Sequence, residues 1–158
     1  MALVEPVIEI SGLDRTIGLL GGAQTIRRPI NSPLDTHDLL TAGLPVRALD
    51  HLINALLVLR HSDQTVELAV GISPRTYYRR RKDTAKPLSR EQSGRVWKFA
   101  EILGRATELM GSQEAAERWL EEPAIGLDQR RPIDLLSTPA GVDTLEAHLT
   151  RIEYGVYA

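Results

Sequence analysis

Apolar residues recur at intervals of three and four along most of this chain, and no other feature of the sequence constrains its fold as strongly. In the segment that ends at Gly111, the apolar positions are Val96, Phe99, Ala100, Leu103, Ala106 and Met110. Residues three or four apart lie on one face of an α-helix, whereas a half-buried strand alternates apolar and polar residues at every second position. No segment alternates in that way, so the sequence predicts an all-α fold.

Capping and breaking residues place the individual helices. Ser89 and Gln92 have the spacing of a capping box, which predicts the start of the long helix that ends at Gly111. A second buried helical face is expected after Pro45, formed by Leu49, Leu52, Ile53, Leu56 and Leu57. Further helices are expected between Thr36 and Gly43, at 63–70, from Ser112 to Pro123, at 132–136, and from Pro139 with Val142, Leu145, Leu149 and Ile152 on one stripe.

Residues 71–82 have the layout of the turn and second helix of a helix-turn-helix. Gly71 permits a tight turn, and Ser73 caps the next helix with a free N-terminus that can bind phosphate. From Arg75 to Lys86 there are six basic residues and one acidic residue, a cluster whose affinity for DNA falls steeply with salt. By similarity to helix-turn-helix proteins, Tyr77 should point into the core. The predicted DNA contacts are Ser73, Arg75, Thr76, Tyr78, Arg79, Arg80, Arg81 and Lys82.

Two positions depart from the usual helix-turn-helix pattern. Glu67 stands where such motifs usually have a small residue, and Arg80 stands where an apolar residue would normally anchor the helix. The alternative interpretation is therefore a solvated basic helix end, whose charges suit the negative end of the helix dipole.

Three regions are expected along the chain. Residues 1–35 mix glycine and proline with short apolar runs and predict a loosely ordered arm or one short helix. Residues 36–88 form the helix-turn-helix-like domain, and residues 89–158 form a second helical domain. Residues 1–90 carry 12 basic and 9 acidic groups, while residues 91–158 carry 7 and 12. This asymmetry indicates that the two halves have different partners.

Several function classes are disfavoured by composition. The chain has no cysteine, which removes disulfides, thiolate metal sites and a cysteine nucleophile, and it shows neither a membrane span nor a signal peptide. We therefore expect a cytoplasmic protein. No two of the four histidines, His37, His51, His61 and His148, are three or four positions apart, so no metal site is predicted. Without a nucleophile, base and orienting group together, neither catalysis nor a cofactor is expected.

The second half of the chain resembles the C-terminal part of the Xre/MbcA/ParS family of antitoxins, and the resemblance as a whole covers roughly residues 36–158. Its most specific part is an ordered series of short motifs. They are Leu88-Ser89-Arg90-Glu91-Gln92-Ser93, Glu117-Arg118-Trp119-Leu120 with Pro123, Arg131-Pro132-Ile133-Asp134-Leu135-Leu136, Thr138-Pro139-Ala140-Gly141-Val142 and Leu149-Thr150-Arg151-Ile152-Glu153-Tyr154-Gly155. One position differs: the family commonly has a glycine pair after Leu127, and here Asp128 and Gln129 occupy it.

The resemblance implies an antitoxin that binds a RES-domain toxin acting on NAD, with the antitoxin's extreme C-terminus in the toxin's NAD-binding cleft. On this sequence the toxin-binding residues would be Arg151, Tyr154, Gly155, Val156, Tyr157 and Ala158. An apolar terminus with two tyrosines also favours docking on a partner, although closure of the domain's own core by Ile152, Val156 and Tyr157 is the alternative. The expected partners are the cognate toxin and operator DNA.

Self-association and an alternative function complete the expectations. Because helix-turn-helix proteins usually pair two half-sites, we expect a homodimer that forms through the apolar stripe of residues 90–110 or through the face of residues 49–57. The alternative function is a free-standing helix-turn-helix regulator of transcription, which would bind DNA without a toxin and fold its tail onto itself.

Overall fold

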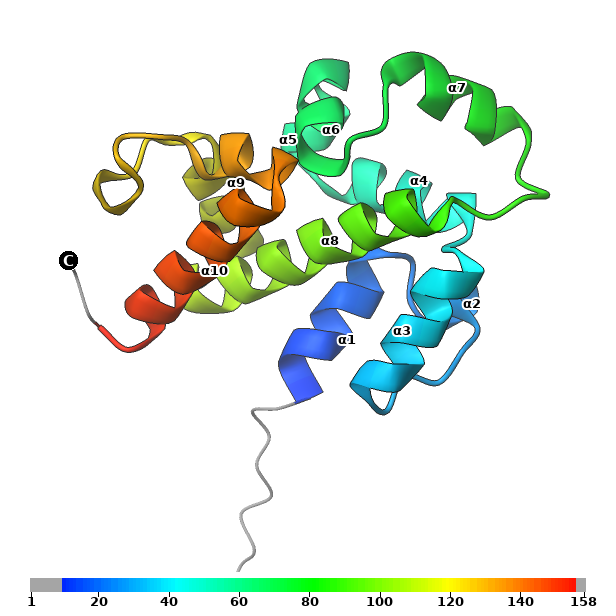
Figure 1. The fold of residues 1–158 in the computed structure, drawn as a ribbon, viewed down its shortest axis with the longest axis horizontal. Coiled ribbons are helices and arrows are strands. Elements are labelled where there is room, and N and C mark those ends of the chain that lie inside the picture. The colour runs from blue at the N-terminus through cyan, green and yellow to red at the C-terminus, as the bar shows by residue number, and fades with distance from the viewer. Residues whose placement is uncertain (1–9, 156–158) are drawn as a thin grey trace, which may run out of the picture.

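The computed structural model describes residues 10–155 of the chain as a bundle of helices around one long central helix (Figure 1). Its α-helices are α1 (Ile10–Leu19), α2 (Ala23–Ile26), α3 (Pro33–Ala42), α4 (Val46–Ala55), α5 (Leu57–Arg60), α6 (Asp63–Val70), α7 (Pro74–Lys82), α8 (Arg90–Met110), α9 (Gln113–Glu121) and α10 (Pro139–Glu153). Two 3-10 helices, η1 (Ile125–Leu127) and η2 (Pro132–Ser137), join α9 to α10. Residues 10–155 contain no β-strand, and the predicted all-α fold is confirmed.

The central helix α8 forms the axis of the bundle. The predicted capping box is present, because the Gln92 N–H donates to Ser89 Oγ at 3.1 Å and the Ser89 N–H donates to Gln92 Oε1 at 3.0 Å. Gly111 ends the helix with a φ of 91°. The apolar positions of α8 are buried against α1, α3 and α6 from the first half of the chain and against α9 and α10 from the second. A single helix thus carries the core of both halves.

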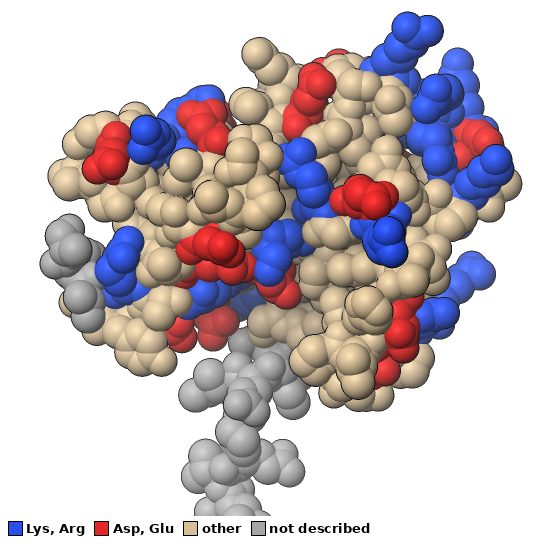
Figure 2. Space-filling model, in the orientation of Figure 1, with Lys and Arg blue, Asp and Glu red and all other residues tan. Residues whose placement is uncertain are grey.

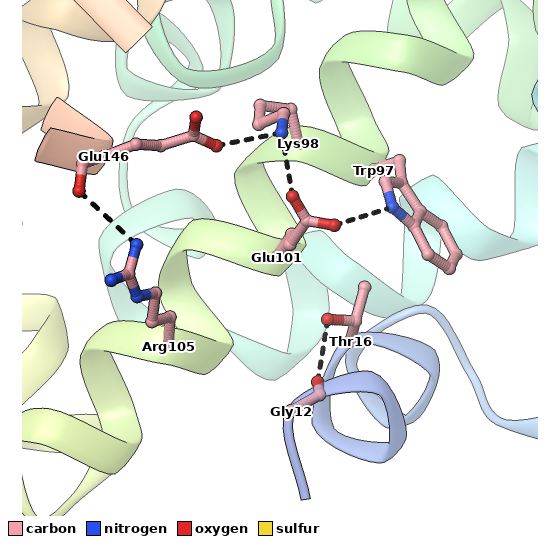
Figure 3. Close-up of polar contacts among 7 residues, drawn as sticks. All are labelled: Gly12, Thr16, Trp97, Lys98, Glu101, Arg105 and Glu146. Carbon is pink, nitrogen blue, oxygen red and sulfur yellow. Dashed lines mark hydrogen bonds and ion pairs between the residues drawn. The ribbon is translucent and has the colours of Figure 1, made fainter. Parts of the chain in front are cut away.

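The segment before residue 35 is more ordered than a loose arm over its described part. It holds two helices, α1 and α2, and α1 packs along α8 (Figure 1). Gly104 of α8 faces α1 at this contact, where a Cβ on the glycine would lie 3.4 Å from Arg15 Cβ, an ordinary contact distance. Thr16 is buried at this contact and donates its hydroxyl hydrogen to the Gly12 carbonyl at 3.0 Å (Figure 3). The prediction for residues 1–9 lies outside the described residues.

The predicted dimer faces are buried within the chain itself. The stretch after Pro45 bends at Leu56, where an extended backbone separates α4 from α5. Leu49, Leu52 and Leu56 on that stretch are fully buried, and the apolar stripe of α8 is equally buried. Most of both faces proposed from the sequence for self-association is thus used within the chain, although Leu57 of the second face is 49% exposed and Met110 of the first is half-buried, and the homodimer itself stays a prediction. Apolar periodicity identifies a buried face but cannot tell an intramolecular contact from an intermolecular one.

Two polar side chains of α8, Ser93 and Arg95, form hydrogen bonds with backbone groups of neighbouring elements. Ser93 Oγ accepts a hydrogen bond from the Leu44 N–H at 2.8 Å, just before α4. Arg95 Nη2 donates to the Leu68 carbonyl in α6 and to the Leu136 carbonyl in η2, each at 3.1 Å. Buried backbone groups without partners are costly, so these side chains bind the two halves into one core. Within residues 10–155, no helix is long and apolar enough to cross a membrane.

Candidate functional site

The predicted turn and second helix fold as α6, a short turn and α7. Gly71 ends α6 with a φ of 71°, and Ser73 Oγ accepts a hydrogen bond from the Thr76 N–H at 3.2 Å at the start of α7. Tyr77 is buried, as predicted, and its hydroxyl donates to Asp50 Oδ1 on α4 at 2.6 Å. Burial, together with the hydrogen bond to the Asp50 carboxylate, raises the pKa of Tyr77, so its phenol stays protonated. Tyr77 thereby fixes α7 on α4.

The turn before α7 is enclosed by Arg95 of α8. A Cβ at Gly71 would lie 2.0 Å from Arg95 Nη1, so the guanidinium occupies the space that a side chain would need. Because Arg95 also holds the last turn of α6 through the Leu68 carbonyl, the angle between α6 and α7 is set from α8. Burial lowers the pKa of Arg95, and the guanidinium nevertheless remains charged at physiological pH.

The outer face of α7 carries the exposed predicted contacts. Arg75, Tyr78, Arg79 and Lys82 are exposed, and Thr76 at the capped N-terminus is half-buried. Figure 2 shows lysine and arginine side chains gathered at the end of the molecule that α7 occupies in Figure 1. The Tyr78 hydroxyl donates to Asp63 Oδ1 at 3.2 Å and thus sits over the start of α6. This face combines cations with a free helix N-terminus, which suits a phosphate backbone.

Arg80 and Arg81 lie differently from the other predicted DNA contacts. The half-buried Arg80 donates hydrogen bonds to the carbonyls of Lys86 and Pro87, so it anchors the loop after α7. Most helix-turn-helix motifs have an apolar residue at this position. Here the hydrogen bonds of Arg80 anchor the helix instead. Arg81 Nε lies 3.2 Å from Asp50 Oδ1, and its guanidinium carbon lies 5.5 Å from the Tyr77 ring centre. Both guanidinium groups are thus engaged within the chain.

The last helix, α10, is fixed on α8 by a row of polar contacts. Lys98 Nζ lies 2.9 Å from Glu146 Oε1, and the Arg105 guanidinium donates to the Glu146 carbonyl (Figure 3). Arg105 Nη2 also donates to Thr150 Oγ1 at 2.8 Å and to Glu153 Oε2 at 2.9 Å. Leu145 and Leu149 are fully buried on the same side of α10. These contacts hold the helix in place up to its last residue.

The predicted tail begins where these contacts end. Tyr154 is 75% exposed, while Arg151 and Ile152 are half-buried at the end of α10. Gly155 has a φ of 68°, the left-handed conformation that ends a helix and can redirect the chain. The predicted contacts Val156, Tyr157 and Ala158 lie outside the described residues. Tyr154 takes no part in closing the domain core.

The loop between α9 and η2 has the left-handed conformation without the glycines. Asp128 and Gln129 have φ values of 52° and 63° at the position where the family commonly has a glycine pair. An isolated antiparallel bridge joins Ala124 to Arg130 and closes the loop. The side chain of Ile125 projects from it and is 81% exposed. This exposure could not be predicted from the sequence, since an isoleucine between Pro123 and Gly126 fits a buried turn equally well.

Titratable side chains do not gather into a metal site in the part of the chain that the structure describes. His37 on α3, His51 on α4 and His61 in the turn after α5 are exposed. His148 of α10 lies over Gly126 of η1, where a Cβ on the glycine would lie 2.8 Å from His148 Cε1. Burial, and secondarily the positive charge of Arg151, lowers the pKa of His148. The ring is therefore a neutral packing group between η1 and α10 at neutral pH.

Two family models match the chain, one over the region that contains α7 and one over the region that contains α10. The antitoxin Xre-like helix-turn-helix domain matches residues 35–101, and the antitoxin Xre/MbcA/ParS C-terminal toxin-binding domain matches residues 105–155. No curated protein gave a match. The two matched ranges meet inside α8, whereas the boundary predicted between residues 88 and 89 precedes that helix and remains a proposal. With the α6–α7 turn in the first range and the exposed end of α10 in the second, the chain belongs to the Xre/MbcA/ParS-type antitoxins.

Proposed function

We propose that this antitoxin neutralises a RES-domain toxin that consumes NAD or transfers ADP-ribose, by placing its C-terminal tail in the toxin's NAD-binding cleft. The observation that carries the proposal is the exposure of Tyr154 at the end of a helix that is otherwise fixed. A large aromatic side chain presented on a rigid support loses little entropy on binding. The resemblance of the C-terminal motifs to antitoxins of RES-domain toxins supports the choice of toxin.

The geometry of the helix end supports a blocking role for the tail. Gly155 has the left-handed backbone that ends a helix, and a second tyrosine, Tyr157, follows it in the sequence. An NAD pocket accepts planar rings. Tyrosine rings match such a subsite, so inhibition would be steric and competitive with NAD.

The same protein would repress its own operon through α7. The proposed DNA contacts are the exposed Arg75, Tyr78, Arg79 and Lys82, together with Ser73 and Thr76 at the capped N-terminus. Arg80 would support the helix through the loop after α7, to which its guanidinium is bonded, while the exposed Arg81, paired with Asp50 on α4, remains a further candidate for a DNA contact. We further propose that the antitoxin binds its operator as a homodimer, because two half-sites a helical turn apart require two copies of α7.

Deletion of the tail tests the inhibitory mechanism. A chain that ends at Glu153 should fold and bind DNA as the full chain does, because Tyr154 is exposed and Leu145 and Leu149 remain. Its complex with the toxin should regain NAD consumption or transfer. The measurement is toxin activity at equal stoichiometry with full-length and shortened antitoxin. Full suppression by the shortened chain would rule out the plug and place inhibition elsewhere in the interface.

A free-standing regulator without a toxin is the second candidate function, favoured by the well-formed turn and capped α7. The two functions differ in whether the protein forms a stable complex with a toxin in the cell. Native mass measurement of the protein expressed with its neighbouring gene product should show a stable complex with a toxin. A protein that is isolated alone under those conditions, and that still binds DNA, would favour the regulator.

A further inference from the structure

We infer that the loop of residues 124–130 is a second anchor for the toxin, in which Ile125 enters an apolar pocket of the toxin outside its NAD cleft. The inference rests on the proposed function, since it concerns the same partner. It assigns affinity to this loop and leaves inhibition to the tail.

Ile125 is the first observation. Its side chain is 81% exposed, more than Tyr154 at 75% or Leu34 at 73%. Unlike a tyrosine, an isoleucine has no polar atom that gains from water. Single exposed apolar side chains are common on protein surfaces, so exposure alone does not mark an interface. The decisive question is whether the fold holds this side chain in one place.

The loop is built to be rigid. The Ala124 N–H donates to the Arg130 carbonyl at 3.1 Å, and the Gln129 N–H donates to the Ala124 carbonyl at 2.9 Å. Leu127 is buried in the core and holds the loop from below. Hydrogen bonds therefore close the loop across its base, while its central apolar residue anchors it. Ile125 is presented on a fixed backbone.

The backbone of the loop is also strained at two residues. Asp128 and Gln129 are consecutive residues with positive φ, which costs residues other than glycine on the order of 1 kcal/mol each. Strain of this kind persists where the surroundings determine the conformation, and it clusters at functional positions. Ile125 is thus exposed on a loop whose shape is held by its surroundings at a cost in backbone strain.

The loop and the tail rest on the same helix. His148 of α10 packs over Gly126 of the loop, and its neighbour Arg151 lies in the last turn before Tyr154. Figure 1 shows the loop and the C-terminal end of α10 at the same end of the molecule. Both lie within the matched toxin-binding domain. A toxin surface that receives the tail therefore continues towards the loop.

The surroundings of Ile125 define the chemistry of the pocket that it would enter. Asp128 and Arg130 are exposed on the same loop, and their charged groups lie 3.7 Å apart. An apolar centre with charges of both signs at its edge is the arrangement of an interface hot spot with its polar rim. The matching site on the toxin is an apolar pocket whose rim carries groups that pair with a carboxylate and a guanidinium.

The test compares two exposed apolar residues. Ile125→Ala should raise the Kd for an inactive variant of the neighbouring gene's toxin product by at least about tenfold, the scale of a hot-spot side chain. Leu34→Ala, on α3 outside the toxin-binding domain, removes an equally exposed leucine and should leave the Kd unchanged. Both variants should unfold at the wild-type temperature, because neither side chain is buried. Calorimetric titration gives the Kd values.

A second pair of variants separates this inference from the plug. The chain that ends at Glu153 should still bind the toxin without inhibiting it, and adding Ile125→Ala should remove most of that binding. If Ile125→Ala binds as tightly as wild type while the full chain inhibits, the loop is not an anchor and the proposed function stands. If the wild-type chain does not bind the toxin, both the proposed function and the role of the loop are ruled out. If Ile125→Ala instead alters self-association of the antitoxin alone, the loop contacts a second copy, and the inference fails.

Discussion

Glu117 and Val58 lie 59 residues apart in sequence, and the Val58 N–H donates a buried hydrogen bond of 2.9 Å to Glu117 Oε1. Val58 is in the first turn of α5, where backbone N–H groups have no partner within their own helix. The carboxylate of α9 thus caps a helix of the first half of the chain. This contact joins the two matched domains as directly as the apolar core does.

Replacing Glu117 should test that cap. Glu117→Ala leaves the buried Val58 N–H unpaired and should lower the free energy of unfolding by about 1–3 kcal/mol. Glu117→Gln keeps a carbonyl oxygen as acceptor, so its loss should be smaller. Urea unfolding measures both, and Glu114→Ala on the exposed side of α9 is the control. A Glu117→Ala protein within about 0.5 kcal/mol of wild type would contradict the capping role.

Gly71 should tolerate no side chain. In Gly71→Ala, the new Cβ would meet Arg95 Nη1 at 2.0 Å on a backbone with positive φ, so both stability and DNA binding should fall. Gly18→Ala on α1 is the matched control, because a Cβ there meets nothing within 4 Å and alanine favours helix by about 0.5–1 kcal/mol. Thermal unfolding should shift in opposite directions for the two variants. A common direction would show that Arg95 moves aside at no cost.

The outer and inner arginines of α7 should behave differently towards DNA. Arg75→Ala and Arg79→Ala should each reduce the salt dependence of operator binding by about one unit per lost phosphate contact. Arg80→Ala should mainly loosen the loop that its guanidinium holds and so lower stability. Titrations at several salt concentrations, with Arg118→Ala on α9 as control, measure the slopes. If the slope is unchanged in Arg75→Ala and Arg79→Ala, then α7 is not the DNA-binding helix.

The strained loop should gain stability from glycine. Gln129→Gly removes a side chain from a left-handed residue and should raise the free energy of unfolding by up to about 1 kcal/mol. Asp128→Gly should gain less, because aspartate tolerates this conformation better than glutamine does. Asp143→Gly, within α10, should instead be destabilising. Loss of stability in Gln129→Gly would mean that no strain is stored there.

His148 should make stability depend on pH. Its pKa is lowered in the folded protein, so below its unfolded value of about 6.5 the unfolded chain binds a proton before the folded one does. Stability should therefore fall as the pH drops from about 6.5 to the lower folded pKa. His148→Gln cannot take up this proton, so wild type should lose stability relative to it over that range. A wild-type advantage that is constant from pH 7.5 to 5 would refute this.

Much of the fold could be predicted because its determinants are local in sequence. Ser73, Ser89 and Ser112 cap the helices they were expected to cap, and Gly71 and Gly111 end helices with positive φ. The packing of α1 could not be read in the same way, since glycines interrupt its apolar pattern and the surface that it packs on, α8, lies far along the chain. The break at Leu56 could not be predicted from the local sequence either. The Val58 N–H just after the break is paired with Glu117, which the sequence alone does not place near α5.

The candidate site was predictable to a similar extent. The position of Tyr77 in the core and the exposure of Arg75, Tyr78 and Arg79 agree with what the similarity to helix-turn-helix proteins implies. Arg80 is bonded to the carbonyl of Pro87, and this contact depends on where the loop after α7 folds back. That position is set by tertiary structure, so the local sequence does not predict it. Ile125 carried no signal for the same reason. It lies in a loop with left-handed backbone at Asp128 and Gln129, a conformation that residues of these types do not signal in a sequence.

The continuity of α8 limits how such a chain can change by recombination. A crossover between the two matched domains would fall within residues 101–105, in the middle of a helix whose faces are buried by both halves. The hybrid would pair one parent's Val58 amide with another parent's residue at position 117, and one parent's Lys98 with another parent's residue at position 146. Recognition of DNA and recognition of the toxin should therefore be inherited together, and new combinations should arise by substitutions on the outer faces of α7, the 124–130 loop and the tail.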